Sequence, residues 1–330
     1  MNKKQIVIDT INNKRRDVLP YYLDLTDIVR GRLIEYFNDP RFEKEVGNFL
    51  AQERNESFIE LDNRRKQDMF GVVWSQDQEG DFGIVEEYIL KKPEFGDYSF
   101  PEPDEKMIRE KCERLVKEKD LFKLYIIGFS LFERAWSLRG MENLLMDFIL
   151  NPSFAEELLD RIVDYNLKVM DIVFEYPVDA IFFGDDWGQQ KGLIMGPKIW
   201  RKFLKPRLKK MYSKTKEHDL YVAQHSCGDI HEVFPDLVEI GLDIYNTFQP
   251  EVYDVEFMKK EYGKDITFYG GISTQQLLPK ATPEEVKKET KRLMDIIGKD
   301  GGYIVAPTHS IPNDVSTENI LAFLEVVQNQ

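Results

Sequence analysis

Short runs rich in Val, Ile, Phe and Tyr alternate along this chain with long amphipathic stretches, and this alternation limits the possible folds more than any other feature. Such runs suit strands that are buried on both faces, as in a parallel sheet. Amphipathic helices between them predict right-handed β-α crossovers. There are eight runs, at residues 18–25, 69–74, 124–129, 180–184, 220–225, 244–248, 266–270 and 303–306.

Eight strand–helix units predict an α/β fold, and specifically a single (β/α)8 TIM barrel domain over residues 1–330. No Gly-rich G-x-G-x-x-G sequence follows a predicted strand, which argues against an open dinucleotide-binding sheet. Two segments interrupt the pattern. Residues 27–63 are charged and are predicted to form an N-terminal helical elaboration. Residues 75–105, rich in Asp, Glu, Gly and Pro, are predicted to form an excursion over the barrel mouth.

The charge and cysteine content narrow the possible partners and the compartment. The 330 residues include 45 Lys and Arg against 59 Asp and Glu, a formal net charge of −14. A surface this acidic repels nucleic acid and anionic lipid, so we expect neither as a partner. Cys112 and Cys227 are too few for a disulfide framework. No apolar run approaches about 18 residues, and the start lacks a signal-peptide pattern, so we expect a cytoplasmic protein.

Polar and small residues follow several of the predicted strands, at the end where a (β/α)8 barrel carries its reactive groups. They point to a site for a small-molecule substrate at the barrel mouth. The candidates are Phe129, Asp185, Asp186, Trp187, His225, Cys227, Gln249, Gly271, Ser273 and His309.

The spacing of His225 and Cys227 suggests a metal site. Residues i and i+2 of an extended strand point to the same side, and zinc accepts mixed His and Cys ligands. His309 is the best candidate for a third ligand, and Asp185 or Asp186 would supply an oxygen ligand or orient an imidazole. Two alternatives stay open at this point. A buried Cys often acts as a small hydrophobe, and the Asp185-Asp186 pair is also typical of a helix cap.

Several motifs together resemble one known superfamily. They are Gly-Phe-Ser-Leu-Phe-Glu-Arg-Ala-Trp at 128–136, Gly-Asp-Asp-Trp-Gly at 184–188, His-Ser-Cys-Gly at 225–228, Tyr-Gly-Gly-Ile-Ser-Thr at 269–274 and the tail around His309. The chain resembles the uroporphyrinogen decarboxylase-like superfamily, nearest its corrinoid-dependent zinc methyltransferase branch. This resemblance implies the same (β/α)8 barrel.

The superfamily contains enzymes of two kinds, decarboxylases and methyltransferases, and the resemblance implies different site residues for each. The decarboxylases hold the carboxylates of a tetrapyrrole with an Arg-rich N-terminal segment, whereas this chain has only Arg15 and Arg16 before the first predicted strand. The methyltransferases bind zinc through a His-x-Cys pair and a distant Cys. Here the distant position carries His309, which makes the metal a stronger Lewis acid and suits a methoxylated compound or an amine.

The leading hypothesis is therefore a zinc-dependent methyltransferase-like enzyme that moves a methyl group between a small molecule and a corrinoid. No D-x-H-x-x-G corrinoid motif occurs, so the corrinoid would belong to a partner protein. His225, Cys227 and His309 would bind zinc. Asp185, Asp186 and His309 would act in catalysis. The residues expected to contact the substrate are Phe129, Trp187, Gln249, Gly271 and Ser273.

Two rival interpretations use the same fold. A decarboxylase or lyase without metal would use Asp185 and Asp186 as an acid–base pair acting on a carboxylated small molecule. A non-catalytic barrel would only hold a small molecule at its mouth. The sequence also leaves the oligomeric state open, although homodimers are the commonest assembly.

Overall fold

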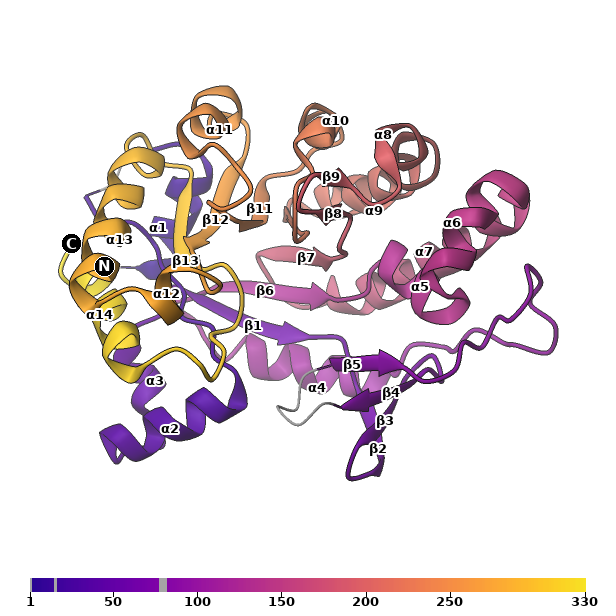
Figure 1. The fold of residues 1–330 in the computed structure, drawn as a ribbon, viewed down its shortest axis with the longest axis horizontal. Coiled ribbons are helices and arrows are strands. Elements are labelled where there is room, and N and C mark those ends of the chain that lie inside the picture. Colours follow the sequence, from indigo (N-terminus) through magenta and orange to yellow (C-terminus); the bar gives the residue numbers. More distant parts are fainter. Residues whose placement is uncertain (1, 15–16, 77–81) are drawn as a thin grey trace.

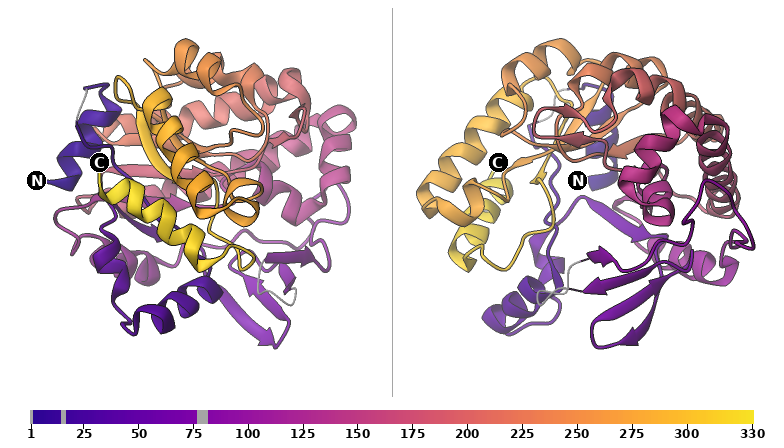
Figure 2. Two further views of the ribbon diagram at one scale, coloured as in Figure 1. Left: turned by 60° about the vertical axis from the view of Figure 1, so that its left-hand side comes forward. Right: turned by 45° about the vertical axis from the view of Figure 1, so that its right-hand side comes forward.

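A seven-stranded parallel sheet curves through the centre of the computed structural model, with helices on its outer side (Figure 1, Figure 2). The structure describes residues 2–14, 17–76 and 82–330. Arg15, Arg16 and residues 77–81 of the predicted excursion lie outside this part. The fold is α/β and resembles a TIM barrel. In sheet order the strands are β1 (Leu50–Arg54), β6 (Phe122–Ile127), β7 (Ala180–Gly184), β10 (Tyr221–His225), β11 (Ile244–Phe248), β12 (Thr267–Ile272) and β13 (Tyr303–Pro307).

The first predicted strand, residues 18–25, adjoins both edges of this sheet as an extended segment. On one side Tyr22 N donates to Val305 O of β13 at 3.0 Å, and Val305 N donates to Pro20 O at 2.9 Å. On the other side Phe49 N, just before β1, donates to Tyr21 O at 3.1 Å. The segment therefore occupies an eighth position beside the seven paired strands.

The helices follow the amphipathic stretches of the sequence. In α13 the Thr282 side chain accepts from Glu285 N and the Glu285 side chain accepts from Thr282 N, so the helix begins with a capping box. Its buried residues, Val286, Thr290, Leu293 and Ile297, recur every three or four positions, which places them on one face. No helix in the described part of the chain is long and apolar enough to cross a membrane.

The helices are α1 (Lys3–Ile11), α2 (Asp27–Phe37), α3 (Phe42–Val46), α4 (Glu105–Leu115), α5 (Phe132–Arg139), α6 (Met141–Leu150), α7 (Pro152–Val173), α8 (Gly196–Ile199), α9 (Lys205–Glu217), α10 (Phe234–Glu239), α11 (Val255–Tyr262), α12 (Leu277–Lys280), α13 (Pro283–Ile297) and α14 (Thr317–Gln328). A π-helical turn, Trp200–Leu204, joins α8 to α9, and a 3-10 turn, His231–Val233, precedes α10. Two short strands, β8 (Gly188–Gln189) and β9 (Gly192–Leu193), pair beside them.

The prediction of a barrel strand at 69–74 is wrong, and so is the helical prediction for the whole of 27–63. Helices α2 and α3 occupy only the first part of 27–63, and β1 of the central sheet follows them. The sequence of β1, Leu-Ala-Gln-Glu-Arg, ends in two charged residues and therefore lacks the apolar pattern of a buried strand. The apolar run 69–74 instead contributes to a second sheet.

This second sheet is antiparallel and lies beyond the carboxyl end of β1 (Figure 1). Its strands are β2 (Phe58–Asp62), β3 (Arg65–Asp68), β4 (Val73–Gln76) and β5 (Phe82–Val85). The Trp74 ring lies 5.2 Å from the Phe129 ring and 6.0 Å from the Trp136 ring, measured between centroids. The insertion predicted for 75–105 thus starts earlier, and it packs against α5 and the end of β6.

A buried ion pair between Asp68 and Arg134 anchors this sheet to α5. Both side chains are nearly inaccessible to solvent. Asp68 also accepts hydrogen bonds from Phe70 N at 2.9 Å, Val72 N at 3.0 Å and Trp74 Nε1 at 3.1 Å. The carboxylate is therefore fully partnered, and its removal would leave a buried guanidinium without its charge partner.

We expect Asp68→Ala to lower the free energy of unfolding by about 3–5 kcal/mol, because it leaves the Arg134 charge and three N–H donors unpaired in the interior. Denaturant unfolding measures the effect. Asp62→Ala, at the exposed Asp62–Arg65 pair of the same sheet, is the control and should change stability little. Equal effects of the two substitutions would contradict the anchoring role of Asp68.

Candidate metal centre

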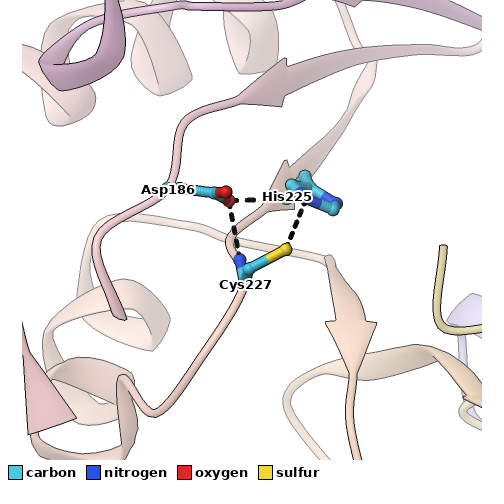
Figure 3. Close-up of side chains that lie close together, drawn as sticks. All are labelled: Asp186, His225 and Cys227. Carbon is cyan, nitrogen blue, oxygen red and sulfur yellow. Dashed lines mark hydrogen bonds and ion pairs between the residues drawn. The ribbon is translucent and has the colours of Figure 1, made fainter. Parts of the chain in front are cut away.

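Three potential metal ligands converge at the carboxyl ends of β7 and β10: Asp186, His225 and Cys227 (Figure 3). The strand register sets His225 beside Gly184, two residues before Asp186. The three donor atoms all lie within 4.8 Å of one another. Cys227 Sγ is 3.4 Å from His225 Nε2, and His225 Nε2 is 3.4 Å from Asp186 Oδ1.

The two separations of 3.4 Å suit a zinc ion. Zn–N and Zn–O bonds of about 2.0–2.1 Å and a Zn–S bond of about 2.3 Å in tetrahedral geometry place neighbouring ligand atoms roughly 3.3–3.6 Å apart. Imidazole, thiolate and carboxylate are all ligands that zinc accepts, and three protein ligands leave one position for a substrate. The donor set of this site therefore fits a catalytic zinc ion.

A hydrogen bond on the far side of the ring sets the tautomer of His225. Its Nδ1 lies 2.5 Å from Asn246 Oδ1, and the Asn246 amide donates to Tyr269 O at 3.1 Å. Because the amide nitrogen is used by Tyr269, the oxygen must face His225 and accept its Nδ1 proton. The Nε2 lone pair is then free on the side of Cys227 and Asp186, as metal binding requires.

The backbone around Cys227 is held in place by two side chains. Cys227 N donates to Asp186 Oδ1 at 2.7 Å, and Gly228 N donates to Gln249 Oε1 at 2.8 Å. Gly228 has φ +74°, and a Cβ there would lie 2.4 Å from a backbone carbon of Gly188. Only glycine fits this position. Gln249 is buried and shapes the loop that presents the thiol.

The electrostatics of the site favour a cation. Burial, and then the charges of Asp186 and Glu133, raise the pKa of the Cys227 thiol. Burial, and then the charges of Asp186 and Asp185, raise the pKa of Glu133 well above its usual range. A divalent cation among these groups would reverse these effects and favour their anionic forms. The sequence analysis did not select Glu133, although it lies within the 128–136 motif.

His309 lies beside the three donors without belonging to the converging set. Its ring centroid is 6.1 Å from that of His225, and the planes meet at 73°. The side chain is open to solvent, but protein atoms surround it closely enough for burial to lower its pKa, and the His225 charge lowers it further. The third donor of the converging group is Asp186, whereas the sequence analysis expected His309 there.

Asp185 and Trp187 are structural neighbours of the donors. The Asp185 carboxylate accepts from Leu131 N at 3.2 Å, Phe132 N at 2.9 Å, Glu133 N at 2.7 Å and Trp187 Nε1 at 2.5 Å. It thus satisfies the first turn of α5, a role typical of a helix-capping carboxylate. Burial raises its pKa to about 6, although these hydrogen bonds oppose the shift. Both side chains are fully buried, whereas the Asp186 side chain is 37% exposed.

The other predicted substrate-contact residues lie at the strand ends, and each has a partner within the chain. Phe129 has φ +48° and packs on Trp74. Gly271 has φ +93°, and a Cβ there would meet the Tyr303 hydroxyl at 2.3 Å. Ser273 donates to the Glu251 carboxylate and accepts from Gln276 N at 2.9 Å.

The fold and the site together define a class of protein. It is a TIM-like α/β protein with potential metal-ligand side chains at its strand ends. A family model described as uroporphyrinogen decarboxylase matches residues 72–330, and the chain belongs to this family. The motifs of the sequence had indicated this relationship, which the match confirms.

Two proteins of Methanosarcina mazei are similar to this chain at low sequence identity. The methylated-thiol–coenzyme M methyltransferase of Methanosarcina mazei is 22% identical over 193 residues, covering 58% of this chain and 49% of that protein. The chain thus spans about half the length of this curated relative. A solved structure, a methyltransferase from Methanosarcina mazei, has a TM-score of 0.73 at 15% identity, covering 100% of this chain and 99% of its own. That likeness supports the fold.

The two adjacent aspartates should respond differently to substitution. We expect Asp185→Ala to lower the free energy of unfolding by about 2–4 kcal/mol, because four donors lose a charged acceptor in the interior. Asp186→Ala removes the hydrogen bond from Cys227 N and the 3.4 Å contact with His225 Nε2, both at a partly exposed side chain, and should cost less than about 1 kcal/mol. Denaturant unfolding of both variants measures the difference. A larger loss for Asp186→Ala would overturn this assignment of roles.

Proposed function

We propose that this chain is a zinc-dependent methyltransferase-like enzyme that moves a methyl group between a small molecule and a corrinoid carried by a partner protein. The observation that carries the proposal is the convergence of donor atoms of His225, Cys227 and Asp186 within 4.8 Å of one another, with His225 Nε2 at 3.4 Å from both Cys227 Sγ and Asp186 Oδ1. Membership of the uroporphyrinogen decarboxylase family and likeness to proteins named as methyltransferases support it.

In this proposal three side chains hold the metal and a fourth orients one of them. His225, Cys227 and Asp186 bind zinc, and Asn246 keeps the Nε2 lone pair of His225 available. Zinc, when bound, supplies a Lewis acid that lowers the pKa of a coordinated substrate group. A substrate could reach these three donors from the mouth, because the Asp186 side chain is only partly covered and His309 is exposed.

His309, whose ring centroid lies 6.1 Å from that of His225, would accept a proton from a substrate bound at the three donors. Its lowered pKa keeps the imidazole neutral near pH 7, so a ring nitrogen has a lone pair to accept a proton. The environment of Asp185 argues against the metal-free decarboxylase, because backbone and indole donors occupy that carboxylate. It is therefore poorly suited to serve as half of an acid–base pair.

Metal analysis tests the proposal directly. We expect protein purified without chelator to carry close to one zinc per chain, and His225→Ala to lose most of it. His231→Ala is the matched control, since His231 is exposed and its ring pairs with Asp229, away from the three donors. The zinc-loaded protein should also methylate a thiol with methylcobalamin as donor, measured as thioether by mass spectrometry. Zinc content unchanged by His225→Ala, or activity that survives a chelator, would contradict the proposal.

The orientation of His225 gives a second test. We expect Asn246→Ala to weaken zinc binding by roughly 10–100-fold, because the Nδ1 proton loses its acceptor and the ring is free to turn. Asn246→Asp keeps an acceptor at this position and should retain more of the affinity. Competition with a chromophoric chelator measures both. Equal zinc affinity in the alanine variant and the wild type would show that the tautomer is set in another way.

A further inference from the structure

Two buried tyrosine hydroxyls bind the backbone on either side of Cys227. The Tyr245 hydroxyl donates to Ser226 O at 2.9 Å, and the Tyr253 hydroxyl donates to Gly228 O at 2.8 Å. Tyr245 is the second residue of β11, and Tyr253 follows in the loop between β11 and α11. The Tyr245 side chain is fully buried and that of Tyr253 nearly so. The thiol is therefore carried by a segment whose flanking carbonyls are bound by side chains from a different part of the chain.

The peptide group that precedes Cys227 is bonded at both of its ends. Its carbonyl oxygen, Ser226 O, accepts from Tyr245, and its N–H group, Cys227 N, donates to Asp186 Oδ1 at 2.7 Å. Asp186 Oδ1 is also the oxygen that lies 3.4 Å from His225 Nε2, so this acceptor is shared with the candidate metal centre. The Tyr245 hydroxyl is not shared in this way. When a metal engages Asp186, Tyr245 would still hold the peptide and with it the direction of the Cys227 side chain.

Aromatic packing fixes the positions of both hydroxyls. The Phe234 ring of α10 lies 4.8 Å from the Tyr245 ring and 6.0 Å from the Tyr253 ring, edge to face in both cases. The Phe248 ring stacks on Tyr253 at 5.6 Å, with the planes 2° apart. All four rings are buried, and these are arrangements that aromatic pairs prefer. The hydroxyl oxygens therefore cannot move without repacking of this cluster.

Adjacent residues of β11 thus contact both parts of the His-x-Cys pair. The strand register sets Asn246 beside His225, and Asn246 accepts the Nδ1 proton of that imidazole. Successive side chains of a strand point to opposite faces of the sheet. Tyr245 accordingly lies on the other face, where it packs on Phe234 of α10 and reaches Ser226 O. One strand therefore supports the imidazole from one side and the backbone of the thiol from the other.

The two hydroxyl protons cannot serve every contact of the pair. The hydroxyl oxygens of Tyr245 and Tyr253 lie 2.9 Å apart, and the Tyr253 oxygen also accepts from Ile230 N at 3.1 Å. Each phenol has one proton. Because Tyr253 donates to Gly228 O, the Tyr245 proton is divided between Ser226 O and the Tyr253 oxygen. Loss of the Tyr253 hydroxyl would leave that proton entirely to Ser226 O, whereas loss of the Tyr245 hydroxyl would remove it from the peptide before Cys227.

We propose that Tyr245 and Tyr253 are positioning residues of the metal centre, which act through Cys227 and are not ligands themselves. By binding the carbonyls of Ser226 and Gly228 they set the direction in which the Cys227 thiol points. The consequence for metal affinity rests on the proposed function. The consequence for the thiol does not, because it depends only on the two hydroxyls and the backbone that they bind.

Metal binding to the full chain tests the proposal. Tyr245→Phe removes one hydroxyl and keeps the ring, and we expect it to weaken zinc binding by roughly tenfold in competition with a chromophoric chelator. With cobalt(II) in place of zinc, the thiolate-to-cobalt charge-transfer absorption should also weaken or shift, because the thiolate meets the metal at a different angle. Tyr253→Phe should have the smaller effect on both measurements, since Tyr245 then donates only to Ser226 O.

The matched control is Tyr21→Phe. The Tyr21 hydroxyl is also buried and donates to a backbone carbonyl, Val46 O at 2.6 Å, but it lies outside the donor cluster. This variant should lose a similar amount of stability and keep the wild-type zinc affinity and cobalt spectrum. A wild-type affinity and spectrum in Tyr245→Phe would overturn the proposal, and so would an equal loss in Tyr21→Phe. If Tyr245→Phe does not fold, Tyr253→Phe is judged against Tyr21→Phe by the same two measurements.

The reactivity of the thiol separates this inference from the zinc proposal. If the wild type binds no zinc, the proposed function fails, and reaction of the metal-free chain with a chromogenic aromatic disulfide decides the role of the tyrosines. Cys227→Ser provides the blank for Cys112. We expect Tyr245→Phe to react at least about threefold faster than the wild type and Tyr21→Phe, because the released segment exposes the Cys227 thiol more often. Equal rates in the three proteins would overturn the positioning role.

Discussion

The hydrogen bonds to one buried carboxylate determine the geometry on which the site depends. Asp185, directly after β7, accepts from three consecutive backbone N–H groups of α5 and from the Trp187 indole. It thereby joins the end of a central strand to the start of the next helix. The neighbours on each side of this junction are Asp186 and Glu133, which lie at the donor cluster because Asp185 holds both backbones in position.

The mouth is electrostatically divided. Acidic groups and the thiol gather at β7, β10 and α5, where burial and mutual repulsion raise the pKa values of Cys227 and Glu133. On the side of β1 and the segment 18–25, Arg54 and two tyrosines provide donors.

Part of the site was predictable because it depends on local geometry. The His225-x-Cys227 spacing predicted two donors on one side of a strand, and the structure places them 3.4 Å apart. The third donor was harder to predict from the sequence, since Asp185 and Asp186 are adjacent residues of the same type. Only the course of the chain after β7 buries the first as a helix cap and leaves the second beside His225. Asn246 was missed because its role depends on its contact with His225 across the paired strands β10 and β11.

The sequence by itself determined the succession of strands and helices, the family and the position of the His-Cys pair, because apolar periodicity and i, i+2 spacing are local properties. The tertiary structure decided which segment completes the central sheet and which acidic and basic residues face the mouth. β1 carries Glu53 and Arg54 and resembles no buried strand in its sequence. Glu53 pairs with Arg114 of α4 whereas Arg54 is exposed to solvent, and only the assembled sheet sets these two environments.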